Sequence, residues 1–283
     1  MITDVYTRPP ALLVIACLAV VGTTLGSCRK SDLAQEPRAR VKDVSIGVVV
    51  PLTGEVATYG TAILNGVRLA AEELNSSSGI HFVLKIEDDQ ANPRVGVAAA
   101  RKLITIDRTP AVIGAVASSV TLSIAPIAEQ SGVVLLSPAS SSPKLTHAGA
   151  YIFRNYPSDT LEGDLAAAFA LKRGWRRASV VVMNNDYGVG LQEVFVASYR
   201  SGGGVILTND TFNEGTADFR AMLVRLGRDK PDVIFSVGYG RELGTLARQA
   251  RALGIRAQLL STVNFHCCPR QLGSTGMPRM NSG

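Results

Sequence analysis

The feature that most constrains this chain is an alternation of short apolar runs with stretches of helical period, from about residue 44 to about residue 260. Continuous apolar runs of strand length are typical of parallel strands that are buried on both faces. We predict strands at 44–50, 82–87, 111–114, 133–136, 178–183, 205–207, 233–237 and 258–260. The first helix is indicated by apolar residues that share one helical face, namely Ile63, Leu64, Val67, Ala70, Ala71 and Leu74. Further helices are predicted at 95–106, 120–130, 159–172, 190–200, 218–226 and 242–253.

This alternation predicts an α/β fold in which parallel sheets are covered by helices on both faces. The units fall into two sets that meet near 151–155, so we expect a first lobe over 44–154 and a second over 155–263. A composition of 46% hydrophobic and 18% charged residues suits such a fold and argues against disorder. Ligands bind at the carboxyl ends of strands in open α/β sheets, which directs attention to the loops that follow each strand.

The first residues of the chain predict export. Arg8 precedes a stretch without charges that contains an almost continuously apolar run at 11–21, which indicates a signal peptide over 1–27. A membrane anchor needs about 18 or more strongly apolar residues, and glycines and threonines dilute this run. Leu25-Gly26-Ser27-Cys28 resembles the bacterial lipobox, which implies lipid attachment at Cys28 and a tether over 28–43.

Composition excludes several other kinds of protein. The net charge of +6 is scattered over predicted helices without a basic stripe, so we expect no nucleic-acid partner. No cysteine lies between residues 29 and 266, and the histidines lack ligand spacing, so we expect no disulfide in the body and no metal site. Gly238-Tyr239-Gly240 departs from the dinucleotide-binding pattern, and no Walker, GxSxG or HExxH motif occurs. We therefore predict no cofactor and no enzymatic activity.

Polar side chains gather in the loops at the predicted sheet edge. Ser118 and Ser119 follow a strand and open a helix, where either could cap the helix and where free amides suit a carboxylate. Ser140 and Ser141 follow the next strand, and Asp159 opens the second lobe. Neutral donors on one side and an acid on the other are what a zwitterion needs. The alternative is that the serines, and likewise Asp159, merely cap helices.

Several ordered segments carry a family resemblance, namely Pro51-Leu52-Thr53-Gly54, Ser137-Pro138-Ala139, Phe153-Arg154-Asn155-Tyr156-Pro157-Ser158-Asp159 and Asp186-Tyr187-Gly188-Val189-Gly190. Over about 44–263 the chain resembles the Leu/Ile/Val-type solute-binding proteins of ABC importers. That resemblance implies a type I periplasmic-binding clamshell, with two lobes that close on an amino acid or a related acid or amide. It also implies ABC permease partners and a location in the periplasm or at the cell surface.

Matched motif by motif, the resemblance assigns a role to each candidate site residue. Ser118 and Ser119, together with Ala139, Ser140 and Ser141, would bind the ligand carboxylate. Asp159 would bind the amino group. The side-chain pocket would be lined by Tyr59, Tyr187 and Tyr239. Glu162 stands where many relatives have Gln. The alternative function is a ligand-sensing receptor subunit of the same fold for amides or small aromatic acids.

The alternation stops beyond Asn264, and residues 264–283 match neither a helix nor a strand pattern. Chains of the resembled family continue past this point. We therefore expect an aberrant tail from a shifted reading frame or a truncated gene model, with both lobes incomplete, and a non-functional fragment is one alternative for this chain. The alternative is a genuine short variant with a disordered tail.

Overall fold

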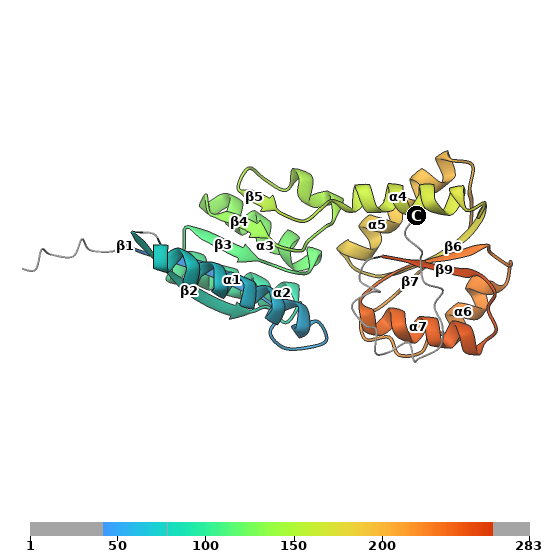
Figure 1. Cartoon of the computed structure of the whole chain (residues 1–283), viewed down its shortest axis with the longest axis horizontal. Coiled ribbons are helices and arrows are strands. Elements are labelled where there is room, and N and C mark those ends of the chain that lie inside the picture. The colour runs from blue at the N-terminus through green and yellow to red at the C-terminus, as the bar shows by residue number, and fades with distance from the viewer. Residues whose placement is uncertain (1–41, 78, 263–283) are drawn as a thin grey trace, which may run out of the picture. The chain divides into compact units, whose positions relative to one another are not determined.

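The protein is described by a computed structural model over residues 42–77 and 79–262. These residues form two sheets in which every pairing is parallel (Figure 1). The first sheet has the order β2-β1-β3-β4-β5, with strands Lys42–Val50 (β1), Ile80–Asp88 (β2), Ala111–Gly114 (β3), Val134–Ser137 (β4) and Ile152–Arg154 (β5). The second has the order β7-β6-β8-β9, with strands Arg177–Met183 (β6), Val205–Phe212 (β7), Val233–Val237 (β8) and Gln258–Ser261 (β9).

Helices connect these strands, as the alternation predicts. They are Ala57–Ser77 (α1), Pro93–Arg101 (α2), Ser118–Ser131 (α3), Asp159–Lys172 (α4), Asp186–Ser201 (α5), Arg220–Gly227 (α6) and Gly240–Ala252 (α7). A π-helical segment, Lys102–Ile106, continues α2, and a 3-10 helix spans Pro143–His147. The predicted class of parallel sheets covered by helices is confirmed. The change of sheet falls between β5 and β6, while the division into lobes at 154 stays a prediction.

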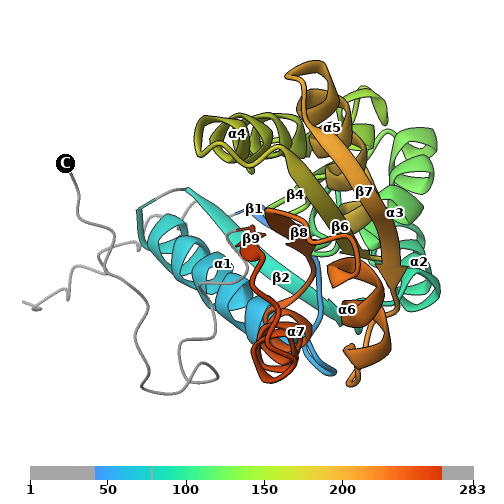
Figure 2. The ribbon, with the colours of Figure 1, turned by 90° about the vertical axis from the view of Figure 1, so that its right-hand side faces the viewer.

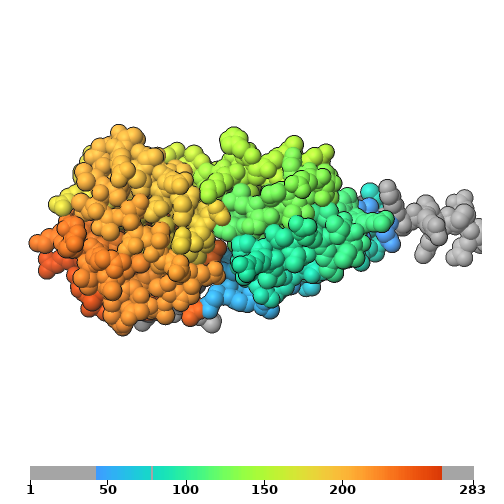
Figure 3. All heavy atoms as spheres, turned by 180° about the vertical axis from the view of Figure 1, so that it is seen from behind, coloured from blue at the N-terminus to red at the C-terminus, as the bar shows by residue number. Residues whose placement is uncertain are grey.

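Alternate residues of the central strands face different helices, and this builds a core on each face. In the second sheet, Val180 and Val182 pack with α4 and α5, whereas Val181 and Met183 pack with α6 and α7 (Figure 2). In the first sheet, Val49 packs with α2 and α3, and its neighbour Val48 packs with Leu64 of α1. The space-filling view shows the surface that these elements present on the side opposite to that of Figure 1 (Figure 3).

Two helices leave apolar side chains at the surface of the described part of the chain. On α1, Leu64 is buried, but Leu74, predicted for the same inward face, is 48% exposed. Helix α4 buries its small residues Gly163, Ala167 and Ala170. Its larger residues are exposed, namely Leu161, Leu165 and Phe169. On both helices, therefore, only some of the apolar side chains are buried against the rest of the protein, and the others are exposed.

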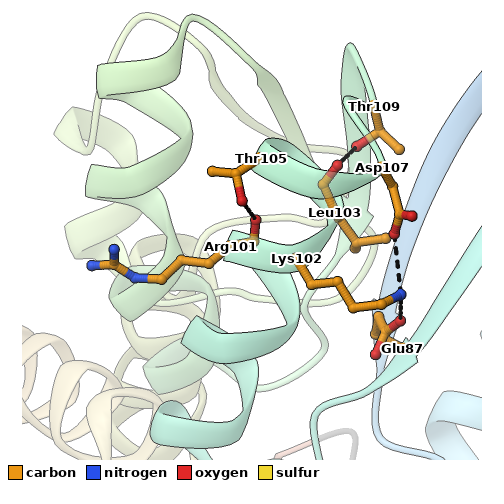
Figure 4. A network of polar contacts seen from close by, with 7 residues as sticks. All are labelled: Glu87, Arg101, Lys102, Leu103, Thr105, Asp107 and Thr109. Atoms are coloured by element: carbon orange, nitrogen blue, oxygen red, sulfur yellow. Dashed lines mark hydrogen bonds and ion pairs between the residues drawn. The ribbon is translucent and has the colours of Figure 1, made fainter.

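Lys102 joins the π-helical segment to the first sheet (Figure 4). Its Nζ lies 2.5 Å from Glu87 Oε1 at the end of β2 and 3.1 Å from Asp107 Oδ2. These two hydrogen-bonded carboxylates raise the pKa of Lys102. Beside it, the Thr109 hydroxyl donates to the carbonyl of Leu103 at 3.1 Å. The network fixes the chain where α2 turns toward β3.

Among the described residues, no helix is both long enough and apolar enough to cross a bilayer. The predicted signal peptide over 1–27, the lipid attachment at Cys28, the tether up to residue 41 and the tail over 264–283 lie outside the described residues.

Candidate functional site

A cavity of about 280 Å³ lies at the carboxyl ends of the strands, where loops from both sheets meet. Its lining is mostly apolar and aromatic and comprises Val56, Tyr59, Val116, Ala117, Ser118, Ala139, Ser141, Tyr156, Glu162, Tyr187 and Tyr239. The position agrees with the general rule for open α/β sheets. Of the predicted site residues, the cavity brings together Tyr59, Ser118, Ala139, Ser141, Tyr187 and Tyr239.

The start of α3 forms one wall of the cavity. The prediction that Ser118 or Ser119 caps this helix is wrong, because Ala117 occupies the N-cap position and its carbonyl accepts from the amides of Val120 and Thr121 at 3.0 Å. The serine hydroxyls bond elsewhere: Ser118 Oγ accepts from the amide of Ser142 at 3.3 Å, and Ser119 Oγ accepts from the amide of Asp186 at 3.0 Å. Alanine offers no capping oxygen, so the first turn of α3 has no side-chain cap.

The loop after β4 forms the adjoining wall. Ala139 and Ser141 line the cavity, but Ser140 does not. Ser140 Oγ lies 2.7 Å from Thr121 Oγ1 and donates to the carbonyl of Val116 at 3.1 Å. In this structure the Ser140 hydroxyl therefore holds the loop against the start of α3.

Asp159 lies behind Ser141 and is the first residue of α4. Its side chain is buried, with 1% of the residue exposed, and its Oδ2 accepts from Ser141 Oγ at 3.0 Å. The other oxygen, Oδ1, is buried and has no hydrogen-bond partner among the described residues. The cap of α4 is Ser158, whose hydroxyl accepts from the amide of Thr160, so the alternative that Asp159 caps this helix is wrong.

Burial controls the ionisation of Asp159. Burial, with a smaller contribution from the nearby charge of Glu162, raises the pKa of the carboxyl to about 7, although the hydrogen bond from Ser141 and the charge of Arg154 act to lower it. A buried acid with an unpartnered oxygen is costly on its own and is satisfied by a donor or a cation. The geometry therefore provides a place for a positively charged group.

Tyrosines form the far side of the cavity. The rings of Tyr187 and Tyr239 are stacked, with centroids 6.3 Å apart and planes inclined by 10°. The Tyr187 hydroxyl donates to Thr262 Oγ1 at 2.9 Å, and burial raises its pKa well above the usual value. Tyr187 therefore presents a neutral aromatic face to the cavity.

Contacts between loops of the two sheets border the cavity. Lys144 Nζ lies 2.9 Å from Asp186 Oδ1, next to the bond between Ser119 and the Asp186 amide. Arg241 and Glu55 form a second ion pair. Such exposed ion pairs contribute little to the stability of the fold. The first pair links the start of α5, which carries Tyr187, to the loops of the first sheet, and the second links the start of α7 to the loop after β1.

A sequence model of the family described as periplasmic binding protein matches residues 43–280 of this chain. The chain belongs to the periplasmic binding protein family. The predicted type I periplasmic-binding fold and the resemblance to Leu/Ile/Val-type proteins are thereby confirmed.

Known members of the periplasmic binding protein family include relatives of moderate identity. The Leu/Ile/Val-binding protein BraC3 of Rhizobium johnstonii is 34% identical over 242 residues, which are 84% of this chain and 65% of that protein. The Leu/Ile/Val-binding protein of Escherichia coli K12 is 30% identical over 233 residues, covering 81% of this chain and 63% of that protein. This chain thus spans less than two thirds of the length of either relative.

Solved structures show the same fold. A leucine binding protein from Thermotoga maritima has a TM-score of 0.74 and 33% identity, covering 77% of this chain and 63% of that one. A solute-binding protein of Rhodopseudomonas palustris in complex with 4-hydroxybenzoate has a TM-score of 0.73 at 20% identity, covering 79% of this chain and 62% of that one. The second likeness concerns the fold alone.

The periplasmic binding protein also places residues at the cavity that sequence reasoning missed, namely Val56, Val116, Ala117, Tyr156 and Glu162. Sequence spacing could have indicated two of them, because Tyr156 and Glu162 lie three residues before and three after Asp159. In contrast, Ser119, Ser140 and Asp159 do not line the cavity but bond to the loops around it.

Proposed function

We propose that this chain is the extracytoplasmic substrate-binding component of an ABC importer and that it binds a branched-chain or related amino acid between its two halves. The observation that carries the proposal is Asp159, a buried carboxylate with an unpartnered oxygen beside the cavity. An ammonium group satisfies both the charge and the empty acceptor position. Membership of the family and the names of the relatives support the same class of ligand.

The remaining walls suit the other parts of an amino acid. The uncapped first turn of α3 and the Ser118 hydroxyl offer neutral donors to the carboxylate, while the Ser141 hydroxyl beside them donates to Asp159. Ser119, Ala139 and Ser140 complete this proposed carboxylate site, the two serines through the bonds that hold its loops. The ligand side chain then lies among apolar and aromatic residues, namely Val56, Tyr59, Val116, Tyr187 and Tyr239.

The alternative is a sensing receptor subunit for amides or small aromatic acids. The structural neighbour in complex with 4-hydroxybenzoate shows only that a protein of this fold binds an aromatic acid. The buried carboxylate of Asp159 disfavours this alternative, because a ligand that has a carboxylate but no ammonium group leaves Asp159 unpaired. We therefore place the amino-acid ligand first.

Calorimetry on the purified 283-residue chain tests this proposal. We expect one of the branched-chain or related amino acids to bind and to be recovered unaltered. Binding to the native state alone should stabilise the fold by about 2.7 kcal/mol at a ligand concentration a hundred times Kd, which raises Tm. Absence of binding across the common amino acids, or recovery of a chemically altered ligand, contradicts the proposal.

We also propose export to the periplasm with lipid attachment at Cys28, which rests on the sequence and on the family. Cys28→Ala should move the protein from the membrane fraction to the soluble fraction or leave the precursor uncut. Cys17→Ala, inside the apolar run, is the matched control and should change neither. Unchanged membrane retention and processing in Cys28→Ala would show that Cys28 is not the anchor.

A further inference from the structure

The charge of the cavity lining is one-sided. Among its lining residues none is Lys, Arg or His, and Glu162 is the one carboxylate. Asp159 adds a second acid directly behind Ser141. The neighbouring base, Arg154, donates from Nη1 to the carbonyls of Ser141 and Ser142 at 3.1 and 2.8 Å, and from Nη2 to Thr146. Among the described residues, the cavity is therefore lined by one acid, backed by a second directly behind its wall, and is lined by no base.

The two acids belong to the same turn of α4. Residues three apart on a helix are neighbours on its surface, which brings Glu162 beside Asp159. Their closeness is evident in the effect of Glu162 on the pKa of Asp159, and both charges also act on Tyr187. Glu162 is half-buried and borders the cavity, whereas Asp159 is fully buried.

An ammonium group has three N–H donors and fits between two such carboxylates. Asp159 Oδ1 supplies a buried acceptor that has no hydrogen-bond partner among the described residues, and the Glu162 carboxylate adds acceptor oxygens at the cavity wall. A ligand carboxylate near α4 would instead meet the negative charge of Glu162 and, once it is ionised, that of Asp159, and no basic side chain of the described residues lines the cavity. The same pair thus attracts one ligand group and repels another.

We propose that Glu162 is a second ammonium-binding carboxylate, which together with Asp159 makes the site require an amino group on its ligand. This inference rests on the proposed amino-acid function and adds a residue that decides specificity. It predicts that acids of the same shape without an amino group are rejected.

The experiment compares two ligands that differ only in that group, L-leucine and 4-methylpentanoate, by calorimetry. The wild-type chain should bind leucine and give no measurable heat with 4-methylpentanoate. Glu162→Gln removes the charge and keeps the shape, so leucine affinity should fall about tenfold or more. The same change should bring 4-methylpentanoate closer to leucine in affinity, because one repulsive charge is gone.

Glu72→Gln, an equal loss of charge on the exposed surface of α1, is the matched control and should leave both affinities unchanged. Circular dichroism and melting of each variant establish that it is folded. Leucine binding that survives unchanged in Glu162→Gln overturns the inference and leaves the proposed function standing. A wild-type chain that binds no amino acid overturns the proposed function itself.

Discussion

Replacing Asp159 with Asn is expected to stabilise the unliganded protein and to remove most of its affinity for an amino acid. The stabilising effect follows from ionisation. The folded-state pKa of about 7 lies above the ordinary value of 3.8, so the folded state holds its proton more tightly than the unfolded state. Below pH 4 the carboxyl is protonated in the folded state, and its full contribution to the free energy of unfolding is present. That contribution is lost as the pH rises toward 7 and the buried carboxyl ionises. At pH 8 the ionised acid therefore destabilises the fold by roughly 2–4 kcal/mol, which Asn avoids.

The effect on affinity has the opposite sign. An ammonium bound by Asp159 is removed from water, and loss of its partner leaves a buried cation unpaired. Such a loss typically costs about 3–5 kcal/mol, or some two to three decades in Kd. A residue that only shaped the start of α4 would give neither effect, since Asn keeps the size of Asp.

The measurement combines melting of the unliganded protein at pH 5 and pH 8 with calorimetry at pH 8. The stability gained by the Asn variant should be larger at pH 8 than at pH 5. Asp89, whose pKa burial raises to about 6, adds a pH dependence of the same sign that both proteins share. Asp229→Asn, at an exposed side chain, is the control and should alter neither property. Normal amino-acid binding by Asp159→Asn would reject the ammonium role and favour a ligand without an amino group.

Central strands and well-capped helices could be predicted closely from the sequence. The bounds of β3, β8 and α4 are those predicted, because a short apolar run marks each strand and a serine cap marks the start of the helix. Strand β7 was predicted too short, since it lies at the sheet edge, where polar residues such as Asn209 and Asp210 are tolerated. The π-helical segment after α2 has no sequence signal at all.

The candidate site could be located from the sequence, but its hydrogen bonds could not. Topology alone brings the ends of β3 and β4 together, which is why Ser118 and Ser141 were found. Which hydroxyl faces the cavity depends on contacts distant in the chain. Ser119 bonds to the amide of Asp186, 67 residues away, and no local pattern indicates that partner.

A pair of glycine substitutions should give opposite changes in stability from the same added methyl group. At Gly188, in the first turn of α5, a Cβ would lie 2.1 Å from the carbonyl oxygen of Met183 at the end of β6. Backbone atoms cannot rotate away as a side chain can, so α5 and β6 would have to separate. The hydrogen bond from the Gly188 amide to Asn185 Oδ1 at 2.8 Å opposes this movement. We expect Gly188→Ala to lower the free energy of unfolding by about 1–3 kcal/mol or more and to weaken ligand binding through the displaced Tyr187.

At Gly66, in the exposed part of α1, a Cβ would meet nothing within 4 Å, so the helix preference for Ala should decide. Gly66→Ala is expected to raise the free energy of unfolding by about 0.8–1.0 kcal/mol and to leave binding unchanged. Urea denaturation of both variants measures the two changes under one condition, and calorimetry measures the affinities. A Gly188→Ala variant as stable as the wild type would contradict the close approach of α5 to β6. The close approach of α5 to β6 also positions Tyr187 at the cavity. Loss of both stability and affinity in Gly188→Ala would therefore show that Gly188 is needed for the fold, whereas loss of affinity alone would show that it matters only for ligand binding.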